Sequence, residues 1–333
     1  MNDVTAVSLS SLDPDAIHQI EALVRRVSRA TGHPALGEPK RSELAHLGGP
    51  GGTVPAGTPA GSTGLLVHDT DAAHPALVGY AQVGHGRRPG EFVTELLLDE
   101  GVDGKVADDL LEAAIATATD DGRREATLRW WVSKATHADD QRARSHGFTL
   151  ERDLVQMRCA LPLASQDGEQ ILPTRPFRTG VDEEAWLVAN NREFAGHPEQ
   201  GQWDLPTLLE REHEPWFDAD GFRVLEVDGR IAGSCWTKIH RDADPPLGEI
   251  YVIGVDPDFQ GRGFGRGLTL AGLDWLSGKG LTVGMLYVDG ANAAARALYG
   301  TIGFRDDHVD RAYVGRFGPS VTPGETAESS GRA

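Results

Sequence analysis

The chain has 333 residues, 39% of them hydrophobic, so it is long and apolar enough to form two domains with packed cores. Its net charge of −18 disfavours nucleic acid and anionic membranes as partners. No apolar run is long enough to cross a membrane, and the first residues lack the pattern of a signal peptide. The two cysteines lie far apart without metal-type spacing, so we expect a cytoplasmic protein without a metal.

The first half of the chain predicts a domain that has a helix over residues 12–30 and ends in a strand over 154–159. Residues 48–64 between them are rich in Gly, Pro, Ser and Thr, and predict a flexible loop. Residues 161–174 form a short polar stretch that suits a linker. We therefore expect an N-terminal domain over residues 1–160.

The second half predicts a C-terminal domain over residues 175–318, followed by a polar, disordered tail at 319–333. Its expected elements, in chain order, are a helix over 182–194, a strand over 248–255, a Gly-rich loop, a helix over 268–276, a strand over 282–288, a short helix over 293–299 and a final strand over 308–314.

The two halves look like copies of one plan. Trp131 to Gly147 align with Tyr287 to Gly303 at a constant offset of 156 residues (287 − 131 and 303 − 147). In both halves a strand, a short helix, a Gly-Phe pair and a final strand follow one another. The repeat predicts two tandem α/β (α+β) domains, each a mixed, mostly antiparallel sheet flanked by helices.

The most informative segment is the loop between the expected strand 248–255 and the expected helix 268–276. Glycines at three alternate positions, Gly261, Gly263 and Gly265, let the backbone turn sharply and leave its N–H groups bare. The helix that follows adds the positive end of its dipole. This combination predicts a site for phosphate oxygens, although neither the Rossmann nor the Walker pattern is present.

The first half has different residues at positions equivalent to polar residues and glycines of the second half. At the offset of 156, Ala143 stands in place of Tyr299, and Thr136 in place of Asn292. The loop equivalent, residues 98–106, lacks the alternate glycines and carries three carboxylates that would repel a pyrophosphate. We expect this half to be non-catalytic.

The pattern Gln-x-x-Gly-x-Gly at 260–265 resembles the pyrophosphate-binding signature of the GNAT family of acetyl-CoA-dependent N-acetyltransferases. The run from Asn292 to Phe304, Asn-x-x-Ala-x-x-x-Tyr-x-x-x-Gly-Phe, is similar to the second hallmark of that family. The resemblance implies two tandem GNAT domains and acetyl-CoA as co-substrate. It leaves open whether the first half also holds a CoA molecule.

Nearly the whole chain also resembles the mycothiol synthases (mycothiol acetyltransferases) of actinobacteria, a tandem-GNAT family. The shared segments are Gly37-Glu38, Gln156-Met157-Arg158, residues 190–201 with His197-Pro198-Glu199-Gln200-Gly201, Trp236-Thr237-Lys238, 248–267, and 286–289 leading into 292–299. The resemblance implies transfer of an acetyl group to the cysteinyl amine of cysteinyl-glucosaminyl-inositol, the last step of mycothiol biosynthesis.

The same resemblance implies roles for individual residues. Glu249 would be the general base and Tyr299 the general acid. The substrate would be lined by Glu38, Glu199, Lys238, Glu249 and Tyr287. Acetyl-CoA would be held by Ile253, Gly254, Val255, Gln260, Gly261, Arg262, Gly263, Phe264, Gly265, Arg266, Asn292, Ala293, Ala294, Ala295, Arg296 and Ala297.

Less specific interpretations remain beside these. Glu249 at the start of a strand could be a solvated carboxylate, Tyr299 could pack against Phe304, and Lys238 could lie on the surface. The enzyme could acetylate another small amine, such as an aminoglycoside, and a decayed copy would be a CoA-binding regulatory module. We expect a small-molecule substrate and a monomer.

Overall fold

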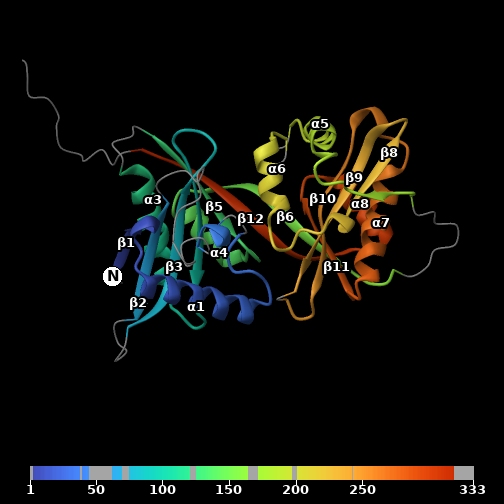
Figure 1. Cartoon of the computed structure of the whole chain (residues 1–333). Coiled ribbons are helices and arrows are strands. Elements are labelled where there is room, and N and C mark those ends of the chain that lie inside the picture. The colour runs from blue at the N-terminus through green and yellow to red at the C-terminus, as the bar shows by residue number, and fades with distance from the viewer. Residues whose placement is uncertain are drawn as a thin grey trace, which may run out of the picture. The chain divides into compact units, whose positions relative to one another are not determined.

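The computed structural model describes residues 3–37, 40–44, 62–69, 75–120, 125–163, 172–196, 201–241 and 243–318. The chain divides into two compact units (Figure 1). Unit 1 comprises Met1–Arg152 and Arg311–Ala333, and unit 2 comprises Asp153–Asp310. The predicted loop at 48–64, apart from its last three residues, and the predicted tail at 319–333 lie outside the described residues.

Unit 1 contains β1 (Val4–Ser8), η1 (Leu9–Ser11), α1 (Pro14–Thr31), β2 (Thr63–Asp69), β3 (Ala76–His85), β4 (Glu91–Leu98), α3 (Gly104–Thr119), β5 (Ala126–Val132) and α4 (His137–Ser145). Its strands lie in the order β1-β2-β3-β4-β5-β12, with β4 and β5 parallel and the other pairs antiparallel. Leu66 and Tyr80 pack in a cluster with α1, whereas Leu65 and Leu128 pack in a cluster with α3. Because neighbouring strand residues face opposite ways, the two helices cover opposite faces.

Unit 2 contains the later part of β6 (Thr149–Ala160), then β7 (Arg175–Pro176), α5 (Glu183–Glu193), α6 (Leu205–Glu212), η2 (Ala219–Gly221), β8 (Phe222–Val227), β9 (Arg230–His240), β10 (Leu247–Val255), η3 (Pro257–Phe259), α7 (Phe264–Gly278), β11 (Val283–Asp289), α8 (Ala293–Ile302) and the start of β12 (Arg305–Phe317). Its strands lie in the order β6-β11-β10-β9-β8-β7. Strands β10 and β11 are parallel, and the other pairs are antiparallel.

The last strand of each half completes the sheet of the other unit. In unit 1, residues 311–317 of β12 pair with β5. In unit 2, residues 154–160 of β6 pair with β11. The units therefore differ from the predicted domains, 1–160 and 175–318, which kept each final strand in its own half. The sequence pattern could not reveal this exchange, because β5 and β11 are equivalent strands of a repeat and offer the same ladder of N–H and C=O groups.

The sheet of unit 2 buries different chemistry on its two faces. Cys235 and Ile250 belong to an aliphatic cluster with α7, whereas Trp236 and Val252 belong to an aromatic cluster with α5 and α6. The alternation of side chains along β9 therefore places α7 on one face and α5 with α6 on the other. Trp236 is fully buried, and its ring stacks on that of Phe222 at 4.4 Å.

The predicted elements are present with small changes in length. The helices expected at 12–30, 182–194, 268–276 and 293–299 correspond to α1, α5, α7 and α8. The final strands are longer than expected, since β6 covers 149–160 and β12 covers 305–317. Capping side chains explain two of the helix starts: Asp13 accepts a hydrogen bond from Ala16 N at 2.7 Å, and Asn292 accepts one from Ala295 N at 3.0 Å.

Gly272 lets α7 approach the sheet closely, which generates a prediction about stability. A Cβ at this position would lie 2.4 Å from Cys235 Sγ and 2.8 Å from Ile250 Cδ1. Gly272→Ala should therefore lower the free energy of unfolding by roughly 1–3 kcal/mol. Gly278→Ala is the matched control, because among the described residues no atom beyond its chain neighbours and its own helix backbone lies within 4 Å of a Cβ there. That substitution should be neutral or stabilising. Urea unfolding measures both, and equal effects would contradict the packing argument.

Candidate active site

The Gly-rich loop joins β10 to α7. Gly261 and Gly263 have φ angles of +74° and +75°, which glycine adopts without steric cost. Within the described part of the chain, no atom lies within 4 Å of a Cβ position at either glycine, so the backbone is open to a ligand there. Gly263 is also the N-cap of α7 and has no side chain to cap it. Bare N–H groups and the positive end of a helix dipole therefore meet at one place, which suits phosphate oxygens.

Ion pairs hold the start of this loop in place. Asp258 accepts hydrogen bonds from Arg230 of β9 and Arg192 of α5, each at 2.9 Å. Both arginines keep the pKa of Asp258 below its usual range. Further along, the Gln260 side chain donates to the carboxylate of Glu193, whose pKa is raised by burial. The loop is thus tied to α5 and β9 as well as to its own strand.

Strands β10 and β11 separate beside the loop. In the described chain their parallel ladder runs from the Leu247–Val283 pair to the Ile250–Leu286 pair, although both strands continue beyond it. At the same point the register of β10 against β9 shifts between Ile250 and Val252, which is a β-bulge at Tyr251. A bulge bends its strand and increases the local twist. The backbone edge of residues 252–255 that faces away from β9 is therefore available to a ligand.

A row of polar side chains crosses the sheet face that carries α5 and α6. In the sheet, Glu249 of β10 lies opposite Lys238 of β9 and opposite Met285 of β11. The side chains of these paired residues point to one face, and so do the side chains at every second position along each strand. We call the following six residues the polar row: Gln156 and Arg158 of β6, Tyr287 of β11, Glu249 of β10, and Lys238 and His240 of β9.

Glu249 is the carboxylate of the polar row, and it is only 8% exposed. Its Oε2 lies 2.6 Å from Nε2 of His240. Lys238 is 6% exposed, and its ammonium lies 4.2 Å from the ring centre of Trp216 and 5.3 Å from that of Tyr251. Hydrogen bonding and cation–π contact compensate for the removal of these charges from water. The interpretation of either residue as a solvated surface side chain is therefore wrong.

Tyr299 approaches from the opposite face. It lies on α8, is 8% exposed, and packs in the aliphatic cluster that contains Ile250 and Leu286. Burial, with a smaller effect of Cys235, raises the pKa of Tyr299 to about 12. The ring also contacts Phe304 edge-on at 5.8 Å. Tyr299 is therefore a neutral phenol in the same buried cluster as Ile250 and Leu286, the last pair that joins β10 to β11.

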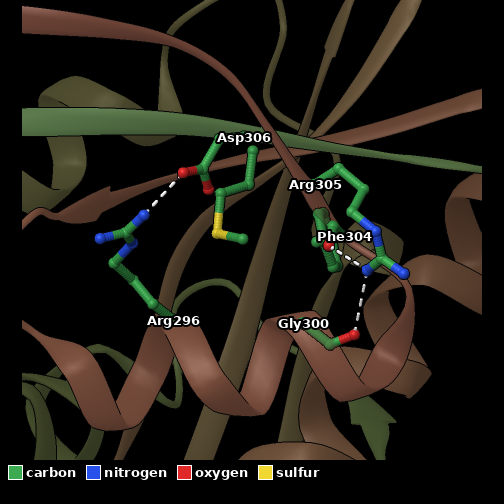
Figure 2. A pocket seen from close by; sticks show the side chains of 6 residues that line it. Arg296, Gly300, Phe304, Arg305 and Asp306 are labelled. Atoms are coloured by element: carbon green, nitrogen blue, oxygen red, sulfur yellow. Dashed lines mark hydrogen bonds and ion pairs between the residues drawn. The ribbon is translucent and has the colours of Figure 1, made fainter.

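The start of α8 is held by a capping side chain and by an ion pair. Asn292 caps the helix, and residues 293–295 form its first turn. Arg296 donates to Asp306 at 2.6 Å, in an open hollow that is also lined by Met157, Gly300, Phe304 and Arg305 (Figure 2). In this structure the Arg296 guanidinium is engaged by Asp306.

Two predicted substrate residues, Glu38 and Glu199, lie outside the described residues. The structure also brings in residues to which the sequence analysis gave no role. His240 could have been noticed, because it lies two positions after Lys238 and a strand repeats every two residues. Gln156 and Arg158 carry the same signal, since they alternate with the buried Val155, Met157 and Cys159.

Unit 1 keeps the arrangement of strands without this chemistry. Glu91 pairs with Thr127 as Leu247 pairs with Val283, again at an offset of 156 residues (247 − 91 and 283 − 127). Glu249 accordingly corresponds to Val93. The counterpart of Tyr299 is Ala143, which is 1% exposed and packs in the core of unit 1.

The structure also bears on metals and membranes. Among the described residues, no group of three or more His, Cys, Asp or Glu side chains is placed to hold a metal ion. Within the same residues, no helix is both long and apolar enough to cross a membrane. Cys159 and Cys235 are free and buried, and burial raises the pKa of each thiol to about 12.

Comparisons with known proteins agree with this geometry. Residues 184–304 match the model of the acetyltransferase (GNAT) family. A mycothiol acetyltransferase of Acidimicrobium ferrooxidans is 38% identical over 301 residues, which cover 89% of this chain and 92% of that protein.

Two solved structures share the fold over almost the whole chain. A GCN5-related N-acetyltransferase from Sphaerobacter thermophilus has a TM-score of 0.68 at 19% identity, covering 96% of this chain and 97% of that one. A tandem GNAT protein from the clavulanic acid biosynthesis pathway has a TM-score of 0.65 at 18% identity, covering 96% and 100%. The predicted tandem GNAT fold is confirmed, and the chain belongs to the mycothiol acetyltransferase family of GNAT proteins.

Proposed function

We propose that this protein transfers the acetyl group of acetyl-CoA to the cysteinyl amine of cysteinyl-glucosaminyl-inositol, which completes mycothiol. The family assignment supports acetyl transfer in mycothiol biosynthesis. The observation that carries the proposal is the position of Glu249: a buried carboxylate lies in a row of polar side chains, directly before the bulge that separates β10 from β11.

The residues around the separation of β10 from β11 fit acetyl-CoA, the co-substrate of GNAT acetyltransferases. We assign its pyrophosphate to the backbone of 260–266 and its pantetheine arm to 253–255, where a strand edge needs a partner. We also propose that the first turns of α8, 292–297, flank the cofactor. Bound acetyl-CoA supplies the thioester carbonyl that the amine attacks.

Glu249 is suited to accept a proton from the substrate ammonium. An amine must lose a proton before it can attack a thioester, and a carboxylate within hydrogen-bond reach can take it directly or through one water. One oxygen of Glu249 is held by His240 at 2.6 Å, which leaves the other for the substrate. His240 therefore acts as a positioning residue for the base.

Tyr299 is suited to donate a proton to the departing CoA sulfur. With its pKa raised to about 12 by burial, the phenol is fully protonated at neutral pH. Glu249 and Tyr299 lie on opposite faces of the sheet, so an acceptor and a donor flank the place where β10 leaves β11. Direct attack in a ternary complex gains mainly from such alignment.

The remaining predicted substrate residues stay part of the proposal. Lys238 and Tyr287 lie in the polar row and would bind oxygens of the sugar or inositol, with Glu38 and Glu199 accepting hydrogen bonds from its hydroxyls. We propose that unit 1 is non-catalytic, because Val93 and Ala143 replace the base and the acid. We further propose a cytoplasmic monomer, since acetyl-CoA is an intracellular donor and both thiols are free.

The substrate is tested by measuring CoA release from acetyl-CoA with three amines. We expect turnover with cysteinyl-glucosaminyl-inositol and none with glucosaminyl-inositol or an aminoglycoside, because only the first offers a cysteinyl amine. Turnover with the aminoglycoside alone would replace the proposed substrate by another small amine. Tight binding of acetyl-CoA without turnover of any of the three would indicate a regulatory module instead.

The acid role of Tyr299 predicts the behaviour of Tyr299→Phe. Loss of the hydroxyl should lower kcat by roughly 10²-fold or more while leaving the KM for acetyl-CoA nearly unchanged. Because the pKa of Tyr299 is raised to about 12, the wild-type residue keeps its proton at pH 10. The factor should therefore be similar at pH 7 and pH 10. Steady-state kinetics measure kcat of both enzymes at each pH. Equal kcat values of the wild type and Tyr299→Phe at pH 10 would mean that the proton donor is a group with an ordinary pKa.

The pairing of His240 with Glu249 predicts a dependence between two substitutions. Glu249→Gln should lower kcat by roughly 10²- to 10⁴-fold, and His240→Leu by about 10-fold. In the double variant His240→Leu should cost nothing further, because His240 acts through Glu249.

His137→Leu, at an exposed position of unit 1, is the matched control. Additive losses in the double variant would show that His240 only supports the fold.

A further inference from the structure

A chain of hydrogen bonds connects β6 to β11 through the polar row. Arg158 Nε donates to Gln156 Oε1 at 2.7 Å, and Gln156 Nε2 donates to the hydroxyl oxygen of Tyr287 at 2.8 Å. The outer end of the chain is anchored by Asp307, whose carboxylate lies 3.4 Å from Nη2 of Arg158. Gln156 and Tyr287 are also direct cross-strand partners, so the contact is part of the sheet.

The direction of both hydrogen bonds follows from the chemistry of the three groups. A guanidinium has only donors, so the amide atom that faces Arg158 is the oxygen. The amide NH₂ of Gln156 must then face Tyr287, and the phenol oxygen accepts. The phenol's own proton is therefore directed away from Gln156. Burial raises the pKa of Tyr287, with Asp310 and Glu249 adding to the rise, so the phenol keeps that proton at neutral pH.

The residues joined by these hydrogen bonds differ in how accessible their side chains are to a ligand. Gln156 is 2% exposed, so its amide is locked between its two partners, whereas the Tyr287 side chain is only half-buried. Tyr287 lies on the same face as Glu249, on the neighbouring strand and two residues beyond its cross-strand partner Met285. A molecule whose amine reaches Glu249 can therefore also contact the Tyr287 hydroxyl.

We propose that Arg158 and Gln156 are positioning residues that make Tyr287 a hydrogen-bond donor to an oxygen of the amine substrate. This inference rests on the proposed function. It adds the direction of the hydrogen bond, which Tyr287 donates and the substrate accepts. The oxygen is a hydroxyl or an amide carbonyl, since both accept a hydrogen bond. A site that fixes a donor in this way selects ligands that carry an acceptor there, because a ligand without one leaves the donor unpaired.

Gln156→Glu tests the proposal by reversing the hydrogen bond to Tyr287. The carboxylate still accepts from Arg158, and it now also accepts the phenol proton, so Tyr287 presents only lone pairs to the substrate. The KM for cysteinyl-glucosaminyl-inositol should rise about 10-fold, while the KM for acetyl-CoA stays unchanged. Tyr287→Phe should cause a similar rise. Gln141→Glu, the same chemical change at an exposed position of α4, is the control and should change neither constant.

The double variant separates positioning from packing. If Gln156 acts through the Tyr287 hydroxyl, Gln156→Glu in a Tyr287→Phe background should add no further rise in KM. An equally large rise in that background, or a rise in the KM for acetyl-CoA as well, would overturn the proposal.

Arg158→Leu is a second variant for the case in which Gln156→Glu unfolds, which thermal unfolding reports. It frees the amide to rotate, so the KM for the amine substrate should rise, but less than in Tyr287→Phe, and an unchanged KM would overturn the proposal. A wild-type enzyme that does not turn over cysteinyl-glucosaminyl-inositol would instead refute the proposed function, so the two failures are distinguishable.

Discussion

The site depends on one constraint, the early end of the pairing between β10 and β11. Four residue pairs join these parallel strands, and after Ile250–Leu286 the bulge at Tyr251 bends β10 away. A strand edge that loses its partner needs other hydrogen bonds, because an unpaired buried peptide group costs free energy. A ligand with an amide-rich arm can supply them. The same strand leads directly into the bare N–H groups at Gly261 and Gly263, so the sites that we propose for the arm and the phosphates lie on one continuous segment.

Successive side chains along a strand point to opposite faces, so the two faces of the unit 2 sheet have different roles. Aliphatic side chains face α7, and the close approach at Gly272 keeps this face densely packed and rigid. The other face carries the polar row, where Glu249 and Lys238 are nearly buried but satisfied by His240 and by aromatic rings. Rigid packing on one face thus holds charged groups on the other at fixed separations, which a reaction between two bound molecules requires.

The comparison of the two units shows that the fold does not depend on the side chains to which we assign the reaction. Unit 1 keeps the parallel pair β4–β5, the helix on each face and the capped short helix, yet it has Val93 and Ala143 at the positions of Glu249 and Tyr299. Strand order and core packing follow from the apolar pattern, whereas the reaction needs single side chains. One unit can therefore lack the groups that we propose to be catalytic and still keep this structure.

The sequence by itself determined the family, the tandem repeat and the positions of α1, α5, α7 and α8, because local periodicity, caps and glycine spacing carry that information. It also singled out Glu249 and Tyr299. The tertiary structure decided that each final strand joins the other unit's sheet, since two equivalent strand edges compete for it. It also decided that His240 meets Glu249 and that Gln156 meets Tyr287. These contacts join residues on different strands, and the register between strands depends on the whole packed sheet.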